Sequence, residues 1–537
     1  MSRKIFIELN HSLTSSAPEA IEDRFVYVDL MHNNIDYLLR SMHLGRAVGL
    51  ITGCRLIGIS GNPGVVAQSA PLDPGQVDVE LAASFGITEI ISVPQHISGH
   101  PDAAATRSAL ESSIAHVQDE RRLSSDEIRA LQQVVTSDGV HVGRFAQDTM
   151  MRSNLQPTLT AGAALKAAFD QVSQLDVWFK SLFDTSPPAA FVTGHIDYAP
   201  WGLCVERAVI AGGVGVYFRC DVRVPIHLFF RPTPATTLNG QLRLAEIQAF
   251  TEFLASSAGG LDELADTRHR IAYSVARNWR WAEAVDSCDA DASWPFSSGL
   301  PCVVLFTHTF TDQPSSDISV FVDHLHWLEC TLEHAARLGT YDLLIKIHPL
   351  DPFFDITSAM DRLEALYSCY ANIAFVRQQI PHSVITERCV LGITVRGTPG
   401  LEMVAAGLPM LLAGRAQYDG LGFSEITDDE PGYFDAIERF ISAPRAQVRA
   451  SLARQYAAYD RLWSAPASPI LGAFDPRRNV DAVWALAVNA ARSTALESDE
   501  ITLALSEAWN KRVAPCRKVT SPLLRATTDL WSNVQTR

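Results

Sequence analysis

The feature that most constrains the fold is an alternation of short apolar runs with longer helix-like runs, which occurs twice along the chain. In the first half FVYVDL, CRLIGIS, ITEIISV, AAFVTG and VGVYFRC are typical of buried strands. In the second half CVVLFTH, YDLLIKIHP, IAFV, CVLGITV and PMLLAG repeat the pattern. Strands that alternate with helices predict parallel sheets covered by helices. We therefore expect an α/β protein with two such units.

The length and the linker signals divide the chain. A chain of 537 residues favours two or three domains over one. The segment from Ser287 to Pro301 is rich in Ser, Asp, Pro and Gly, which indicates a linker. We predict a first Rossmann-like domain over 1–290, a second over 299–490 and a helical tail over 491–537.

Composition excludes several classes of protein. The formal net charge of -16 argues against a dedicated nucleic-acid binder, although a local basic patch can still hold a phosphorylated ligand. The nine cysteines show no CxxC pair and no Cys/His metal spacing, which favours a reducing, cytoplasmic setting without a metal site. The sequence has no signal-like start and no apolar run that could span a bilayer. Peripheral membrane contact stays open.

The first candidate ligand site follows the run YDLLIKIHP. Ligands of open parallel sheets collect at the carboxyl ends of the strands. Lys346 and His348 are two residues apart, so they share one face of this strand near its end. Pro349 turns the chain away from the sheet. The two cationic groups suit phosphate oxygens, although they can also simply end a strand.

The second candidate lies between CVLGITV and the helical run TPGLEMVAAG. We predict Thr398 as the N-cap and Pro399 at the first helical position, with Gly397 and Gly400 clearing the approach of a ligand. The free N–H groups and the positive helix end then form an anion site. Glu402, one turn in, could accept hydrogen bonds from ribose hydroxyls. Alternatively, the threonine is only a cap and the glutamate only complements the helix dipole.

A third candidate is the glycine-rich loop GRAQYDGLGF. Its residues Arg415, Tyr418 and Asp419 could close on a base or a sugar, or form an ordinary turn.

Candidate groups for the chemistry lie in two loops and at one early strand. His195 and Asp197 follow AAFVTG, and the neighbouring Tyr198 and Trp201 could stack on a sugar ring or belong to the core. In the second unit HTFTDQP offers a histidine and a carboxylate.

These two residues are His308 and Asp312, and a turn-forming role for Asp312 is an alternative. Near the amino terminus KIFIEL is predicted as a strand, closed by Asn10 and His11, which could then face the cleft.

The motifs together resemble a known family. VLFTHTFTDQP, FVDHLHWLECTLEHA, IKIHP, GTPGLEMVAAGLPMLLAG and GRAQYDGLGF are similar to segments of the capsule and surface polysaccharide glycosyltransferases of bacteria, a group that includes the Kdo transferases. The resemblance covers roughly residues 303 to 425. It implies a GT-B fold, in which two Rossmann-like lobes face a central cleft. It also implies a donor nucleotide in the second lobe, an acceptor mainly in the first, and no essential metal.

The resemblance also implies roles for single residues. His348 and Pro349 match the family's His-Pro motif, which contacts the donor phosphate, and Thr398 matches its Ser/Thr at the helix start. Glu402 matches the glutamate that holds the donor ribose or sugar. The chain departs from the family at Ile347, where many relatives have proline, and at Arg396, where the residue is often small or polar. Lys346, His348 and Arg396 could all stabilise a leaving phosphate.

The leading hypothesis is a cytoplasmic glycosyltransferase that extends a surface polysaccharide or its lipid-linked precursor. The expected partners are a nucleotide sugar such as CMP-Kdo, which enters as a substrate rather than a cofactor, a saccharide or glycolipid acceptor, and polysaccharide assembly proteins. Three alternatives stay open. They are a nucleotide-sugar 2-epimerase, a polyol-phosphate transferase, and a non-catalytic nucleotide-binding paralogue that serves as an assembly subunit.

Overall fold

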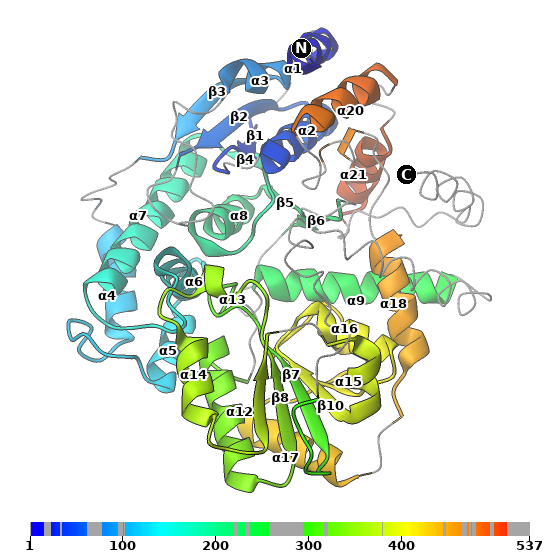
Figure 1. Ribbon diagram of the computed structural model, residues 1–537. Coiled ribbons are helices and arrows are strands. Elements are labelled where there is room, and N and C mark those ends of the chain that lie inside the picture. The colour runs from blue at the N-terminus through cyan, green and yellow to red at the C-terminus, as the bar shows by residue number, and fades with distance from the viewer. Residues whose placement is uncertain are drawn as a thin grey trace.

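The protein is described from a computed structural model (Figure 1). The structure describes residues 2–14, 23–32, 35–61, 78–94, 100, 102–219, 224–230, 237–256, 294–315, 320–377, 380–443, 447–462, 470–471, 474, 480–493 and 499–512. These residues form two lobes, each built on one six-stranded sheet. Most of the predicted linker, the glycine- and proline-rich loop 61–75 and the basic, aromatic segment 268–285 lie outside the described residues, apart from Gly61 and 294–301.

The sheet of the first lobe has the strand order β3-β2-β1-β4-β5-β6, which is the order of dinucleotide-binding folds. Its strands are β1 (Phe25–Asp29), β2 (Arg55–Ser60), β3 (Ile87–Ser92), β4 (Pro188–Thr193), β5 (Val214–Phe218) and β6 (Ile226–Phe229). All pairs are parallel except β5 with β6, so the edge strand departs from the expected all-parallel sheet.

The sheet of the second lobe has the order β12-β11-β10-β7-β8-β9, which repeats the same topology. Its strands are β7 (Cys302–Phe306), β8 (Asp342–Lys346), β9 (Ile373–Val376), β10 (Cys389–Thr394), β11 (Met410–Leu412) and β12 (Glu425–Ile426), and all of them pair in parallel. The prediction of an α/β protein of the GT-B type, with two Rossmann-like lobes, is confirmed.

Helices cover both faces of each sheet. Those of the first lobe are α2 (Ile35–Thr52), α3 (Val79–Ser84), α4 (Ala103–Ser112), α5 (Ser125–Gln132), α6 (Val142–Asn154), α7 (Ala163–Thr185), the π-helix η2 (Tyr198–Gly202) and α8 (Leu203–Ile210). The predicted start of α5 is confirmed, because Ser124 and Glu127 form a capping box.

The helices of the second lobe are α12 (His324–Leu338), α13 (Asp351–Phe354), α14 (Ala359–Tyr367), α15 (His382–Arg388), α16 (Thr398–Ala405), the 3₁₀ turn η3 (Asp419–Leu421), α17 (Glu430–Ser442) and α18 (Ala450–Leu462). Two apolar clusters, one on each face of the sheet, form the core of each lobe.

Three segments connect the lobes or return to the first one. Helix α9 (Leu238–Ser256) runs between them in Figure 1; its first turns pack into the first-lobe core, and Phe250 and Phe253 pack into the second. Helices α20 (Val480–Ser493) and α21 (Glu500–Lys511) pack on α1 (Ser2–Thr14) and α2 of the first lobe. None of the described helices has the length and apolar character that crossing a bilayer needs.

The prediction of a strand at KIFIEL is wrong. The segment belongs to helix α1 (Ser2–Thr14), which buries Phe6 and Ile7 against α3 and α20. A short apolar run fits a strand or a buried helix equally well, and only its tertiary neighbours decide. Asn10 is buried against Ser84, and His11 is exposed on the same helix, so neither closes a strand.

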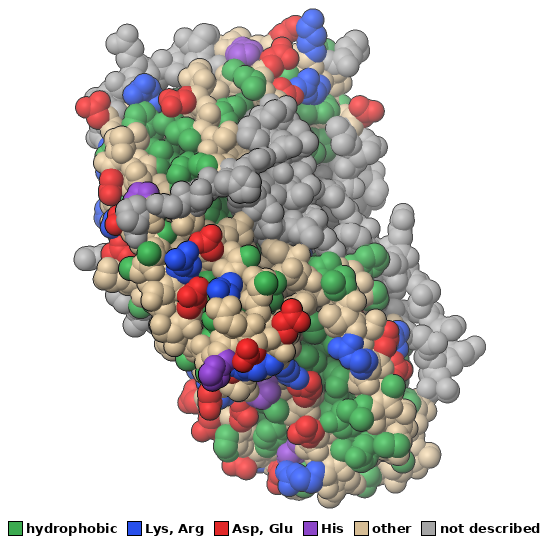
Figure 2. Space-filling model, turned by 90° about the vertical axis from the view of Figure 1, so that its left-hand side faces the viewer, with side chains coloured by type: hydrophobic (Ala, Val, Ile, Leu, Met, Phe, Trp, Pro, Cys, Tyr) green, Lys and Arg blue, Asp and Glu red, His purple; other side chains and the backbone are tan. Residues whose placement is uncertain are grey.

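The surface carries charges of both signs, and the described cysteines are unpaired. The face in Figure 2 mixes acidic, basic and histidine side chains with scattered apolar ones. The described cysteines are all free thiols, namely Cys54, Cys204, Cys302, Cys330, Cys369 and Cys389.

Candidate active site between the lobes

The strand order fixes where a ligand can bind. In each sheet the order in which successive strands are added reverses between two central parallel strands, β1 and β4 in the first lobe and β7 and β10 in the second. The crevice that binds ligands opens at the carboxyl ends of these strands. Most of the predicted site residues lie in the loops at these two edges, so the topology brings them together.

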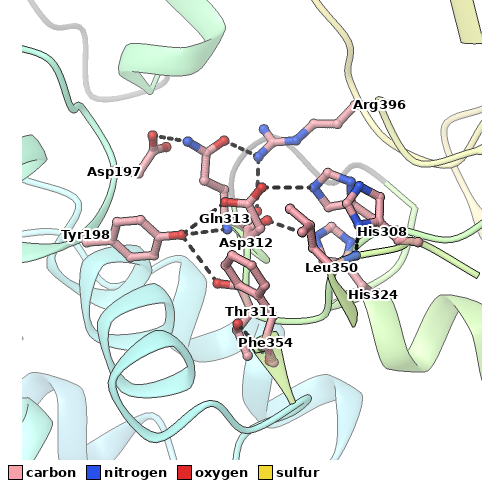
Figure 3. Close-up of polar contacts among 11 residues, drawn as sticks. Asp197, Tyr198, His308, Thr311, Asp312, Gln313, His324, Leu350, Phe354 and Arg396 are labelled. Atoms are coloured by element: carbon pink, nitrogen blue, oxygen red, sulfur yellow. Dashed lines mark hydrogen bonds and ion pairs between the residues drawn. The ribbon is translucent and has the colours of Figure 1, made fainter. Parts of the chain in front are cut away.

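One carboxylate and three histidines meet after β7. His308 Nε2 lies 3.6 Å from Asp312 Oδ2, and His324 Nε2 lies 3.2 Å from the Asp312 carbonyl oxygen. The ring of His308 is 4.7 Å from that of His324 and 6.5 Å from that of His348. Figure 3 shows His308 and His324 beside Asp312.

In this cluster Asp312 is charged at neutral pH, whereas His308 and His324 are neutral. Burial alone would raise the pKa of Asp312, but His308, Arg152 and Arg396 lower it below its ordinary value. Because its pKa is lowered, the carboxylate is ionised at neutral pH. Its side chain is 46% exposed, so it is also accessible. Burial lowers the pKa of His308 to about 4 and that of His324 well below its ordinary value. Both imidazoles are therefore neutral at pH 7.

A chain of side chains joins the two lobes at this point. Arg396, which follows β10, donates to the Gln313 side-chain oxygen, and the Gln313 amide donates to Asp197 of the first lobe (Figure 3). Asn239 of α9 donates to the other Asp197 oxygen at 2.7 Å. Asp197 is only 3% exposed, so its carboxylate orients neighbours rather than facing the cleft.

The His-Pro corner has a defined imidazole tautomer. The backbone N–H of His348 donates to Thr307 Oγ1 at 2.7 Å, and the backbone N–H of Leu350 donates to His348 Nδ1 at 3.2 Å. Because Nδ1 accepts, the neutral ring has its proton on Nε2, where it can be donated to a ligand oxygen. Burial, with the nearby Lys346 charge, lowers the pKa of His348. Lys346 ends β8, and Pro349 begins the turn into α13, as predicted.

The start of α16 lies at the same edge, but its details differ from the prediction. Gly397 is the N-cap, Thr398 and Pro399 occupy the first two helical positions, and no side chain caps the helix. A Cβ on Gly400 would lie 2.2 Å from the Tyr418 hydroxyl, so this glycine makes room for packing rather than for a ligand. Thr398 is exposed.

The remaining candidates of the second lobe lie around this helix start. Tyr418 is buried beneath it, and its hydroxyl donates to the Gly397 carbonyl at 2.6 Å, so it supports the loop from below. Glu402 is partly exposed one turn into the helix. Asp419 accepts from Arg243 of α9 at 2.8 Å, and Arg415 pairs with Asp428 at 3.1 Å.

The first-lobe edge consists of stacked rings. His195 stacks on His32 at 4.8 Å and on Tyr37 at 5.4 Å, and His32 stacks on Trp201 at 4.7 Å. Burial, assisted by the Arg152 charge, lowers the pKa of His195 to about 4. Tyr198 and Trp201 are 4% and 1% exposed, so the idea that they stack on a sugar is wrong and the core alternative holds.

A polar face of α6, which no sequence motif marks, contacts the second lobe. Asp148, 3% exposed, accepts the Ser315 N–H at 2.8 Å, and Arg144 donates to the Ser315 carbonyl at 2.7 Å. Burial raises the pKa of Asp148 to about 7. Asp148 and Asp197 line a cavity of about 20 Å³, which is large enough for one water molecule. A spacing of four residues between Arg144, Asp148 and Arg152 is the signal that could have found this face.

Two further features lie away from this site. A cavity of about 430 Å³ lies between residues 156–160 and helices α12 and α14, and none of the predicted site residues lines it. His326, Cys330 and Glu430 bring potential metal-ligand atoms within 4.8 Å of one another. Glu430 already accepts from Arg129 at 2.7 Å, and these three residues lie on α12 and α17, outside the group around Asp312.

Comparison with known proteins agrees with the motifs. Residues 267–459 match the family model described as "Capsule polysaccharide biosynthesis protein". No curated protein sequence matches the chain. Similar solved structures include two KpsC chains of Thermosulfurimonas dismutans, described as a β-Kdo 2,7-transferase (13% identity, 45% of this chain and 68% of that chain, TM-score 0.27) and a β-Kdo 2,4-transferase (12%, 49% and 76%, 0.31). A third is the UDP-GlcNAc 2-epimerase of Neisseria meningitidis bound to UDP-GlcNAc (11%, 54% and 80%, 0.25).

TM-scores this low give no argument about function, so the family match and the motifs decide the relationship. Over residues 267–459 the chain resembles the capsule polysaccharide biosynthesis family, as the motifs predicted.

Proposed function

We propose that the chain is a glycosyltransferase that moves a sugar from a nucleotide donor onto a surface polysaccharide or its lipid-linked precursor. One observation supports this most directly. An ionised, accessible carboxylate, Asp312, lies at a sheet edge beside His348 and Arg396, and this edge faces the first lobe through Gln313. Glycosyl transfer needs this combination of a base and cationic groups.

In the proposed reaction the acceptor hydroxyl attacks the anomeric carbon while the bond from that carbon to the donor phosphate breaks. Asp312 takes the hydroxyl proton. The negative charge that develops on the leaving phosphate is stabilised by the His348 Nε2–H, the Arg396 guanidinium and the amino end of α16. Asp197 acts through Gln313, because its oxygens are buried and accept from two amides. We assign it a positioning role.

The substrate and the location follow as parts of the same proposal. We infer a CMP-linked acidic sugar such as Kdo as the donor, because the pairing of a His-Pro corner with a Ser/Thr at a helix start is the motif of the family that the chain resembles. A nucleotide-sugar substrate places the reaction in the cytoplasm, with the lipid-linked acceptor at the membrane surface.

The test is a calorimetric titration of the full chain with CMP, UDP and their sugar derivatives, followed by turnover of whichever donor binds. We expect one nucleotide to bind and its sugar to be transferred only when an acceptor is added. A donor that is converted without any acceptor would identify an epimerase. If no nucleotide binds, or if a nucleotide binds and nothing is turned over, the proposal fails.

A further inference from the structure

The polar face of α6 contains one residue, Arg152, with two buried nitrogen atoms that have no hydrogen-bond partner among the described residues. Arg144, Asp148 and Arg152 follow one another at intervals of four, so they lie on one side of the helix. The first two are hydrogen-bonded to Ser315 of the second lobe. Arg152, which lies nearest to the His-Pro corner, makes a different contact.

Arg152 is a buried cation, and none of the carboxylates that the structure describes forms an ion pair with it. It is 9% exposed, and its Nε and Nη1 atoms have no hydrogen-bond partner among the described residues. Its Cζ lies 4.1 Å above the ring of Phe354. The attraction of a cation to a phenylalanine face is smaller than the cost of burying an unpaired guanidinium. Helix α6 ends two residues later, and its dipole favours a cation there, but this effect does not require burial.

The position of Arg152 connects it to the candidate site. Phe354 ends α13, which directly follows the His348–Pro349 corner, and its carbonyl accepts from Thr311 Oγ1 at 3.0 Å. The charge of Arg152 acts on Asp312 of the second lobe and on His195 of the first, whose pKa values it lowers. The guanidinium, which belongs to α6 of the first lobe, therefore lies close to both Asp312 and His195.

We propose that Arg152 binds an oxyanion of the substrate that is distinct from the leaving phosphate, namely a carboxylate or phosphate group on the sugar or the acceptor. A planar guanidinium donates two parallel hydrogen bonds to such a group, and the buried charge is then neutralised. This inference rests on the proposed function, because the second lobe is taken to hold the leaving phosphate. The ring of Phe354 fixes the plane of the guanidinium before the ligand arrives.

The experiment compares the wild-type chain with Arg152→Met and Arg152→Lys, and with Arg377→Met as the control. Arg377 follows β9 and pairs with Asp361 at 2.5 Å on the surface. Each protein is titrated with CMP and UDP, with free Kdo as a sugar carboxylate, and with glucose 1-phosphate as a sugar phosphate. The last two probes distinguish the two sources of the anion.

We expect Arg152→Met to bind one of the two sugar probes roughly 10- to 100-fold more weakly, and Arg152→Lys to recover only part of this loss. Nucleotide affinity should stay unchanged, and so should every affinity of the Arg377 variant. The inference is overturned if the wild-type chain binds neither sugar probe, or if Arg152→Met binds both as well as the wild type does. If the wild-type chain binds neither CMP nor UDP, that result would instead refute the proposed function.

Stability without a ligand gives a second readout. If Arg152 is an unfilled anion site, Arg152→Met should unfold at the same temperature as the wild type or higher, because an uncompensated buried charge has been removed. If the contact with Phe354 is only structural, the variant should unfold at a lower temperature. That result, together with unchanged sugar binding, would contradict the inference.

Discussion

The two sheet edges that face each other have the same topology and opposite chemistry. In the first lobe four rings fill the edge: His32 stacks on Tyr37 at 4.5 Å and on Trp201 at 4.7 Å, with His195 alongside. In the second lobe the same position holds the charged and partly exposed Asp312. Two sheets with one strand order therefore supply an apolar wall and a charged wall to one crevice.

The difference indicates that the two lobes have different roles in the proposed reaction. Stacked, buried rings exclude water, and the low pKa of His195 keeps that imidazole uncharged at neutral pH. Charges on the opposite wall act more strongly in such a medium than in bulk water. We infer that the second lobe handles the charge of the leaving group, and that the first lobe supplies an aromatic surface that excludes water and the cation Arg152. Fold alone does not give this assignment, because function depends on the groups in the site.

The largest effect on this comparison is expected from Asp312→Asn, which removes the accessible carboxylate from the charged wall. If Asp312 is the base, turnover should fall roughly 10²- to 10⁴-fold while nucleotide affinity changes little. Steady-state rates and calorimetric titration measure the two quantities. Asp361→Asn is the control, because this carboxylate is 70% exposed on α14 and should not affect either one. Unchanged turnover in Asp312→Asn would assign the base elsewhere.

Trp201→Ala changes the apolar wall instead. The indole is 1% exposed, so its loss leaves a cavity in the ring stack and should lower the free energy of unfolding by about 3–5 kcal/mol. Chemical denaturation measures this change. Binding of a nucleotide to the second lobe should persist below the unfolding transition, because none of the proposed phosphate-binding residues of that lobe is altered. A parallel loss of nucleotide affinity in the folded variant would show that the two walls do not act separately.

A smaller effect is expected from changes to the residues of the charged wall that we propose bind the donor phosphate. His348→Ala and Arg396→Gln should each weaken nucleotide binding roughly 10- to 100-fold, because each removes a hydrogen bond to a charged group. Arg377→Gln, at the same edge of the sheet, serves as the control. If the nucleotide binds with full affinity to the His348→Ala, Arg396→Gln double variant, the donor site lies elsewhere.

Much of the architecture followed from the sequence because βα alternation has few solutions. Ten of the described strands lie within predicted runs to within one residue, and the carboxyl-end rule placed His348, Thr398 and Asp312 at one edge. KIFIEL was mistaken because a short apolar run has no decisive period. Helix α9 was missed because its apolar residues face two different lobes, and it therefore lacks one apolar stripe.

The site was less predictable because its roles depend on burial. Asp197 and Asp312 are equivalent in the sequence, but the fold buries the first behind two amides and leaves the second accessible. Tyr418 lies in a glycine-rich loop that suggests a ligand contact, yet the chain folds it under the helix start. Asp148 and Arg152 lie in a helix with no recognisable motif, and only the docking of α6 on the second lobe reveals them.

The smallest expected effect tests the buried contact between the two walls through pH. Burial raises the pKa of Asp148 from an ordinary value of 3.8 to about 7 in the folded chain; the Asp197 charge adds to this shift, and the Ser315 hydrogen bonds and the Arg396 charge oppose it. A raised native pKa contributes stability that is complete below pH 4 and is lost as the pH rises through 7. Asp148→Asn keeps the acceptor for the Ser315 N–H and removes the titration. Its stability relative to the wild type should therefore increase by about 2–3 kcal/mol between pH 5 and pH 8, as measured by denaturant unfolding, whereas Asp361→Asn should show no such trend. A difference that is the same at both pH values would mean that Asp148 is already ionised at pH 5, with a counter-charge from the second lobe.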